Sequence, residues 1–417
     1  MANNIILTPN VFCKGVLMNL GGYLSFCRNM TKEYNKEFIG KKVGDTVSVR
    51  KPQIFTATTG LLYQPQPLTN IKTNITVGDV TGVHFEWDGV EKTLSIDEAQ
   101  EKYFKPAAIA MAHRINANAA QFVAQNTYNA VGTPGTTPTL VDTYLAAGDK
   151  IVELGLPPEE SLTCIVNRKF SSQYVIGQKT LYNEAGTIGA MMRKGEVVDS
   201  TLGYTWKRDQ TIYSQTTGPY GGTPLVDATG NVTGTVTADG GSNGTMTLST
   251  RGWTATAASR LVVGDRFTCA GVYSVHPQTK QSTGDLLQFV VLAAFSSNGS
   301  GNGGVMVRPA ITPSGQYQNV TAAPVDGAAI TTFGAANTVS PQAILMHKNA
   351  YAFVSVPLEN PPAGSGAISS MQTDPDTGLS LSLVQFFDGV NRIVGSRLDS
   401  LTGFGILYPE LACAIAG

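Results

Sequence analysis

The charged residues of this chain are distributed so unevenly that they divide it into parts. Residues 215–338 hold only ten charged side chains in 124 positions and no glutamate, whereas residues 1–214 hold 40. Thr, Val and Gly take their place, and β-branched residues with turn formers favour short strands over helices. Segments 232–237, 245–249 and 286–292 predict such strands. We therefore expect residues 215–338 to be an all-β domain inserted into a fold whose two flanking parts belong together.

Two alternating segments flank a proline-bearing stretch near the N-terminus. Residues 43–50 alternate apolar and polar side chains, and residues 71–77 and 83–87 do so again, which is typical of half-exposed strands. Pro65 and Pro67 lie between these segments, and proline cannot donate to a β-ladder. We expect a long hairpin that extends away from a core, with the prolines at its tip.

A long helix is predicted directly after this hairpin. Ser95-Ile-Asp-Glu98 is a capping box, and Pro106 is suited to the first turn of a helix. The apolar side chains of residues 107–128 repeat at helical spacing, and at about 1.5 Å per residue this segment spans roughly 33 Å. Most of these side chains are small, which permits close packing against a sheet or a partner chain.

The parts on either side of the insertion contain further helix and strand signals. Helices are expected at residues 141–154 and 170–182, with a Gly-rich loop at residues 186–195. Strands are expected at residues 162–166, 343–346, 351–356 and 404–414, and a hairpin at residues 380–387 and 391–394 around an Asp388-Gly389 turn.

The low charge bears on the class of protein. Charged residues are only 14% of the 417 residues, and the formal net charge is -1. A surface so weakly charged is typical of surface that other molecules cover, and it argues against attachment to nucleic acid by bulk positive charge. The sequence shows no apolar stretch of ~20 residues and no secretory signal, and its scattered cysteines fit free thiols. We expect a protein made in the cytoplasm, with no membrane partner and no cofactor.

No group of residues predicts catalysis or metal binding. The four histidines stand alone, and the sequence has no Cys-x-x-Cys pair. Residues 240–244 match the spacing around a nucleophilic serine, but strands rather than a strand and a helix are expected on both sides. Asp374-Pro-Asp-Thr-Gly378 resembles the start of a calcium loop, but Gln385 takes the place of the bidentate Glu. The prediction is therefore no enzyme, no catalytic residue and no metal site.

The order of these parts resembles the tailed-bacteriophage major capsid proteins with the Hong Kong 97-type fold. Within that group it is most similar to the phage P22 coat protein family, whose core carries an inserted β-barrel. The most specific segment is Val263-Gly-Asp-Arg-Phe-Thr-Cys-Ala-Gly-Val-Tyr273. The other segments that carry the resemblance are residues 43–49, 95–129, 152–157, 165–168, 195–204 and 397–411.

The resemblance implies an α+β fold with a long spine helix, an extended β-hairpin loop and an inserted all-β barrel domain. The expected parts are an N-terminal arm (1–43), the extended loop with peripheral-domain strands (44–94), the spine helix (95–130), the first part of the axial domain (131–214), the inserted barrel (215–338) and the closing axial and peripheral strands (339–417).

The resemblance also implies a function. Copies of the chain would assemble as pentamers and hexamers into the icosahedral shell that encloses the double-stranded DNA of a tailed bacteriophage. Scaffolding and portal proteins would be partners during assembly in the cytoplasm of the host bacterium. The packaged DNA would make non-specific contacts with the finished virion capsid.

Candidate contact residues follow from the implied fold and from the most basic region of the chain. Candidates for contacts between subunits are Arg50, Lys51, Pro65, Pro67, Lys72, Asp239 and Asn243. Candidates for contact with a polyanion or a scaffold are Lys14, Arg28, Lys32 and Lys36.

Two other functions fit parts of the sequence. A phage tail, decoration or adhesion protein would also be weakly charged and rich in Thr and Gly, but such proteins are mostly all-β and lack a long helix. A cellular enzyme with a β-barrel insertion would need a catalytic cluster, which the sequence does not provide. The structural shell protein remains the preferred hypothesis.

Overall fold

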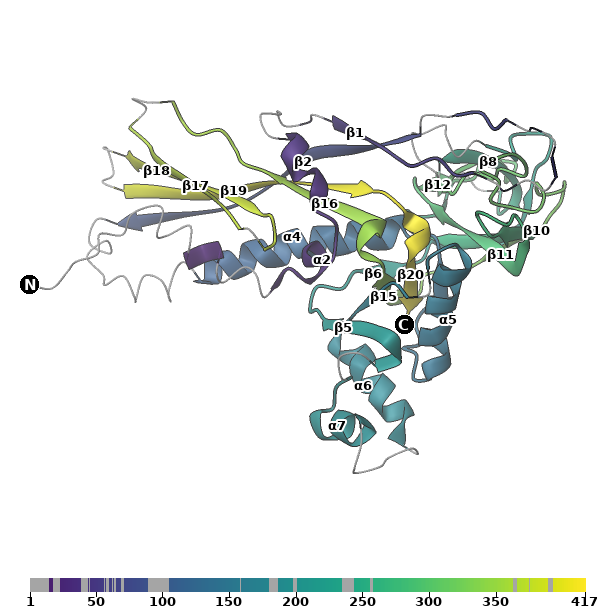
Figure 1. The fold of residues 1–417 in the computed structure, drawn as a ribbon, viewed down its shortest axis with the longest axis horizontal. Helices are drawn as coiled ribbons and strands as arrows, with labels where there is room; N and C mark the ends of the chain where they lie inside the picture. Colours follow the sequence, from purple (N-terminus) through teal and green to yellow (C-terminus); the bar gives the residue numbers. More distant parts are fainter. Residues whose placement is uncertain are drawn as a thin grey trace, which may run out of the picture. The chain divides into compact units, whose positions relative to one another are not determined.

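The computed structural model describes residues 15–17, 23–38, 44, 46–55, 57, 60–61, 63, 65–68, 71–88, 105–157, 159–179, 187–197, 201–234, 244–255, 258–362, 366–374, 376–388 and 393–417. They belong to two compact units, whose helices and strands are labelled in Figure 1. The first unit comprises Met1–Val47, Ile75–Ala119 and Ala352–Gly405, and the second comprises Ser48–Asn74, Ala120–Tyr351 and Ile406–Gly417.

A six-stranded sheet holds the strands of the first unit. Its order is β1 (Thr46–Arg50), β2 (Lys72–Asp88), β19 (Ile393–Ile406), β18 (Ser380–Asp388) and β17 (Ile368–Thr373), with β16 (Tyr351–Val356) also paired to β19. Strands β17, β18 and β19 lie side by side in Figure 1. The predicted hairpin of β1 and β2 is confirmed, and β2 is one continuous strand. The pairing of β18 with β19 is confirmed too, with Asp388 opposite Ile393.

The predicted long helix is confirmed as α4 (Lys105–Asn126). In its first-unit part, Ala108, Met111, Ala112, Ile115 and Ala119 are buried, as the apolar stripe requires. The capping box at residues 95–98 lies outside the described residues. A short helix, α2 (Ser25–Arg28), contacts α4 through the amide of Phe26, which donates to Asn116 Oδ1 at 3.0 Å.

A second sheet joins segments from both sides of residues 215–338. Its order is β3 (Ala130–Gly132), β20 (Ala412–Ala416), β15 (Val339–Met346), β4 (Leu162–Val166) and β5 (Tyr204–Arg208), and β6 (Ser214–Thr216) pairs with the other end of β15. The helix α5 (Val141–Glu153) packs beside β20 (Figure 1). The flanking parts therefore share one sheet, as predicted.

Aromatic rings fill the core of this second sheet and its helices. Tyr144 of α5, Tyr174 of α6 (Arg168–Gly177) and Trp206 of β5 lie with ring centroids 5.3–5.5 Å apart. Such tilted and edge-on pairs add to the free energy of burial. The side-chain oxygen of Asn167 accepts from the Phe170 amide and caps α6 at its N-terminus, one turn before the residue at which we predicted the helix to begin.

The middle of the chain forms a sheet that nearly closes on itself, which we call the barrel. Its order is β14 (Ile330–Thr332), β10 (Arg266–Val275), β11 (Ser282–Val291), β13 (Gly303–Arg308), β8 (Met246–Trp253) and β7 (Gly222–Val226), with β9 (Ser259–Leu261) and β12 (Phe295–Ser296) as a separate pair. The two edges meet where the Val226 amide donates to the Ala328 carbonyl at 2.9 Å and the Gly327 amide donates back at 3.0 Å. The described residues of 215–338 contain strands, turns and loops but no helix, as predicted.

The predicted loop at residues 186–195 is wrong. Residues Thr187–Lys194 form the helix α7 instead, and Met191 is buried. Ala, Met, Arg and Lys are strong helix formers, and they outweigh the single Gly189 inside the helix. Gly195 ends it with φ +64°, and the Glu196 amide donates back to the Met191 carbonyl at 3.2 Å. This pattern is a Schellman C-cap.

Two predicted strands are also wrong in part. Residues 232–234 are not a strand, because the Gly234 amide makes a single main-chain hydrogen bond to the Ile311 carbonyl rather than a ladder. Residues 235–237 lie outside the described part. The single strand predicted at 404–414 is divided between β19 and β20. Pro409 opens a short 3-10 helix between them, since proline has no N–H for a ladder.

Candidate functional site

The segment between β1 and β2 exposes large apolar side chains. Leu61, Tyr63 and Leu68 are 107%, 86% and 77% exposed, and Pro65 and Pro67 are exposed as well. Monomeric proteins rarely concentrate apolar side chains in this way, and such surface commonly marks a contact with another molecule. We call residues 60–68 the loop tip. The candidate contacts Arg50 and Lys72 are also exposed.

Lys51 has a different environment from the other candidates, since it is buried at the base of this segment. Its ammonium group donates to the Leu407 carbonyl and lies 4.6 Å from the centroid of the Tyr408 ring. Burial is the main cause that lowers the pKa of Lys51 to about 8; Glu410 opposes the shift and Arg308 adds to it. The side chain therefore anchors the base of the segment to the turn after β19.

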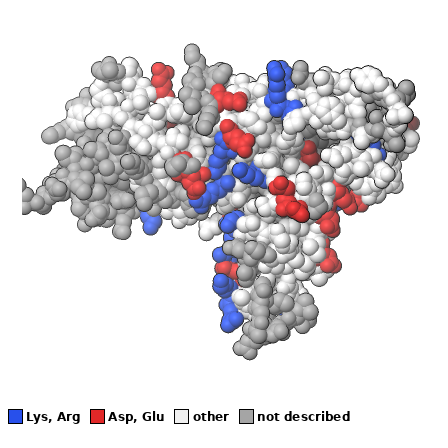
Figure 2. All heavy atoms as spheres, viewed as in Figure 1, with Lys and Arg blue, Asp and Glu red and all other residues white. Residues whose placement is uncertain are grey.

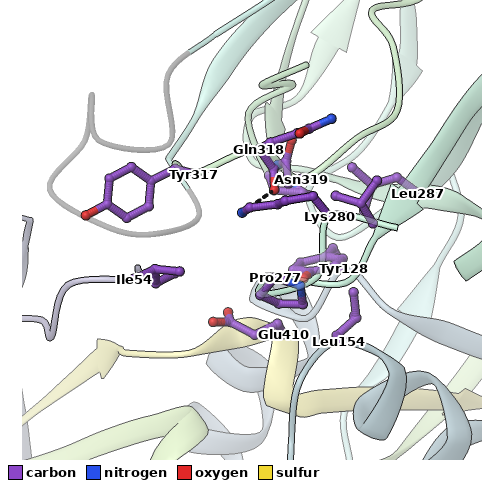
Figure 3. Close-up of a pocket in the computed structure, with 12 residues that line it drawn as sticks. Ile54, Tyr128, Leu154, Pro277, Lys280, Leu287, Tyr317, Gln318, Asn319 and Glu410 are labelled. Atoms are coloured by element: carbon purple, nitrogen blue, oxygen red, sulfur yellow. Dashed lines mark hydrogen bonds between the residues drawn. The ribbon is translucent and has the colours of Figure 1, made fainter. Parts of the chain in front are cut away.

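A second attachment joins the same base to the barrel. The Gln316 side-chain amide donates to the Ile54 carbonyl, and the Tyr317 hydroxyl donates to Gln53 Oε1 at 2.9 Å. Ile54 and Tyr317 border a small pocket of about 70 Å³, in which they lie across from Leu287 (Figure 3). We call residues 51–55 the loop root.

The barrel is itself attached to its surroundings through the buried guanidinium group of Arg266. This group donates to the carbonyls of Ala124 at 2.8 Å and Thr127 at 2.9 Å, and to Gln342 Oε1 at 3.1 Å. The two carbonyls belong to the C-terminal end of α4, where main-chain acceptors lack helical partners and a cation is favourable. Burial lowers the pKa of Arg266 to about 10. This value is still well above neutral pH, so the guanidinium group stays charged.

A carboxylate and an amide complete this junction. Asp265 accepts from the main-chain amides of Val262 at 2.8 Å and Gly218 at 3.1 Å, and burial raises its pKa to about 6 against the effect of these bonds. The Gln288 side chain bonds reciprocally with the main chain of Ala130, at 2.6 Å and 3.0 Å. The barrel is therefore held by polar groups whose partners lie both inside and outside it.

This junction was not predicted, although the sequence carries a signal for it. Asp265 and Arg266 are two of only ten charged residues in 124, and both lie in the segment that carries the most specific resemblance. Two adjacent charged residues in a segment with so few charges indicate that both side chains are buried and bonded to partners, since charged side chains are rarely buried without partners.

The basic candidates near the N-terminus contact an acidic turn of the same unit. Arg28 forms an ion pair with Asp376, and Lys32 Nζ donates to the Asp376 carbonyl at 2.7 Å. Arg28 lowers the pKa of Asp376. Lys14, Asp239 and Asn243 lie outside the described residues, as does the side chain of Lys36, whose main chain is in the 3-10 helix Glu33–Phe38.

The described residues contain no group of three or more His, Cys, Asp and Glu side chains suited to a metal ion. The Asp374 carboxylate instead accepts from the amides of Asp376 and Thr377, which makes the segment a turn. Among the helices that the structure describes, none is long and apolar enough to cross a bilayer. On the face drawn in Figure 2, charged atoms form small groups separated by uncharged surface.

Comparison with known proteins assigns the chain to a family. The family model described as P22 coat protein, gene protein 5, matches residues 1–417. Similar solved structures include one of Mycobacterium phage Che8 (10% identity, 94% of this chain and 90% of that chain, TM-score 0.46) and the capsid of cyanophage P-SCSP1u (12% identity, 90% and 83%, TM-score 0.43). The I-domain of the CUS-3 coat protein is 30% identical over 28% of this chain and 92% of that chain, with a TM-score of 0.18.

A comparison with curated protein sequences finds no match. The family match nevertheless extends over the whole chain. It agrees with the mixed α and β architecture and with the nearly closed barrel in the middle of the sequence. The chain belongs to the P22 coat protein family, and it is the major capsid protein of a tailed bacteriophage, a structural component of the virion whose copies form the icosahedral shell.

Proposed function

We propose that this chain assembles as a Hong Kong 97-type subunit, with the loop tip as a principal contact between copies. The exposed apolar side chains of the loop tip carry this proposal, since Leu61, Tyr63 and Leu68 have little contact with their own chain. In a shell, a neighbouring copy would cover them. At roughly 25 cal/mol per Å² of apolar area, their burial would contribute several kcal/mol to each contact.

The proposed division of the chain follows the same fold. Residues 1–43 form the N-terminal arm, 44–94 the extended loop and its strands, and 95–130 the spine helix that includes α4. Residues 131–214 and 339–417 form the axial and peripheral parts, and 215–338 the inserted domain. The shared sheet of β4, β15 and β20 supports an insertion, because it joins segments that lie before and after the barrel in the sequence.

The shell that we propose consists of pentamers and hexamers of this chain. A loop that lies between two anchored strands could take slightly different angles in the two kinds of ring. Scaffolding and portal proteins would take part in assembly, and packaged DNA would make non-specific contacts. Because the net charge is only -1, such contacts would depend on local basic groups such as those of the N-terminal arm.

The loop tip provides the test of this proposal. A variant with Leu61, Tyr63 and Leu68 all replaced by Ser should unfold in urea at the same concentration as the natural subunit, because these side chains are exposed. It should form few shells in an assembly reaction followed by light scattering and electron microscopy. Val325→Ser, which alters an exposed apolar residue of the barrel, is the control. Normal shells from the triple variant would refute the role of the loop tip.

A further inference from the structure

We propose that the inserted barrel sets the direction of the extended loop through a clamp formed by Gln316 and Tyr317. This inference rests on the proposed role of the loop in contacts between copies. It gives the barrel a positioning role in assembly. Gln316 and Tyr317 of the barrel hold the loop root, and the loop root determines where the loop tip points. Gln316 and Tyr317 are positioning residues, because they act on a neighbouring copy only through the loop.

The contacts act on the path of the main chain. Gln316 and Tyr317 are consecutive in the barrel, and they bond to Ile54 and Gln53, which are consecutive in the loop root. The bond from Gln316 reaches the carbonyl of Ile54, so it restrains the main chain rather than a side chain. Two adjacent bonds restrain direction as well as position. Lys51 holds the other end of the root at the Leu407 carbonyl.

The clamp is firmly attached to the barrel. Lys280 Nζ donates to the carbonyls of Gln316 at 2.8 Å and Gln318 at 3.2 Å, and Figure 3 shows the Lys280 side chain beside Gln318 and Asn319. Asn319 follows directly, and its amide group donates to the Ala310 carbonyl at 2.6 Å. Since these partners belong to the barrel, the clamp moves with the barrel and not with the loop.

The clamp is also suited to release. Gln53, Ile54 and Phe55 of the root also border an open groove of about 530 Å³, which shares Ile54 and other lining residues with the small pocket of Figure 3. The side-chain oxygen of Gln316 is buried with no hydrogen-bond partner among the described residues. A buried unpaired acceptor reduces the net gain from the contact. A few polar bonds beside open space, rather than dense packing, therefore hold the root, and it can change direction without unfolding the barrel.

The conservative variant Tyr317→Phe tests the clamp, since it removes one hydroxyl and keeps the ring. Tyr273→Phe, on an exposed ring of the same barrel, is the matched control. We expect amide hydrogen exchange of residues 53–68 in the free subunit to rise about tenfold in Tyr317→Phe, the factor that corresponds to the loss of about 1.4 kcal/mol. The free energy of unfolding in urea should fall by no more than the same ~1.4 kcal/mol, and shells from this variant should vary more in diameter than shells from the control.

The proposal is overturned if exchange of residues 53–68 is unchanged, or if exchange rises while the shells keep one diameter. Gln316→Ala provides a second variant with the same expected results, and it removes the bond to the main chain. Failure of the clamp is distinguishable from failure of the proposed function. In the first case the loop-tip variant still blocks assembly, and in the second case the loop-tip variant assembles normally.

Discussion

Replacing Arg266 by Met should loosen the barrel from the rest of its unit. Met keeps most of the apolar volume of the arginine stem but cannot donate. The carbonyls of Ala124 and Thr127 and the side-chain oxygen of Gln342 would then be buried without this donor. Asp265 would also lose a neighbouring cation that lowers its pKa.

The expected magnitude follows from the three acceptors that lose their donor. A buried polar group left without a hydrogen-bond partner costs about 1–3 kcal/mol. Three acceptors at the lower end of this range give a loss in the free energy of unfolding of about 3 kcal/mol.

Urea unfolding of the monomeric subunit, followed by tryptophan fluorescence, measures this loss. Arg260→Met is the matched control, because the buried Arg260 side chain bonds to Tyr220, Thr254 and Ser297, which all lie within residues 215–338. In the isolated fragment 215–338, Arg260→Met should still destabilise the fold, whereas Arg266→Met should not. The reasoning is refuted if Arg266→Met costs less than about 1 kcal/mol in the full chain, or if it destabilises the fragment as much as the full chain.

Three further perturbations test other parts of the structure. The pKa of Lys51 in the folded chain is about 8, below its ordinary 10.5. As the pH rises from 8 to 10.5, the free energy of unfolding of the natural chain should therefore rise by about 3 kcal/mol relative to that of Lys51→Met. A difference between the two chains that stays constant over this range contradicts the burial of Lys51. The pKa of Asp265 in the folded chain is about 6, above its ordinary 3.8. As the pH rises from 4 to 7, the free energy of unfolding of the natural chain should therefore fall by about 3 kcal/mol relative to that of Asp265→Asn. An increase in this difference with pH would show that the pKa is lowered instead. Arg28→Ala should speed amide exchange of residues 23–38 at low salt but not at 1 M salt, since the pair with Asp376 is exposed; equal effects at both would exclude an ionic latch.

Much of the fold could be predicted from sequence periodicity and from the distribution of charge. The strand alternation at residues 43–50 and 71–87 and the stripe of α4 both follow from one-sided burial, which a local pattern records. The helix α7 was missed because the glycines at residues 186–195 were given more weight than the Ala and Met residues between them. At that position Gly195 ends a helix and does not mark a loop.

The candidate site was less predictable. Lys51 was expected to contact another subunit because it lies in the implied extended loop. The alternation that buries Val47 and Val49, however, also places Lys51 on the buried side. That part was available from the sequence. The partners of Arg266 were not, because Ala124 and Thr127 lie about 140 positions away and only the folded chain brings them together. The clamp could not be predicted for the same reason, because more than 260 positions separate Gln53 from Tyr317 in the sequence.

Electron cryomicroscopy of particles assembled from the full chain tests the central claim most directly. We predict closed icosahedral shells of pentamers and hexamers, in which a neighbouring copy covers Leu61, Tyr63 and Leu68. The account is contradicted if the chain forms only small rings, trimers or open filaments, or if the loop tip faces solvent in every copy of a closed shell.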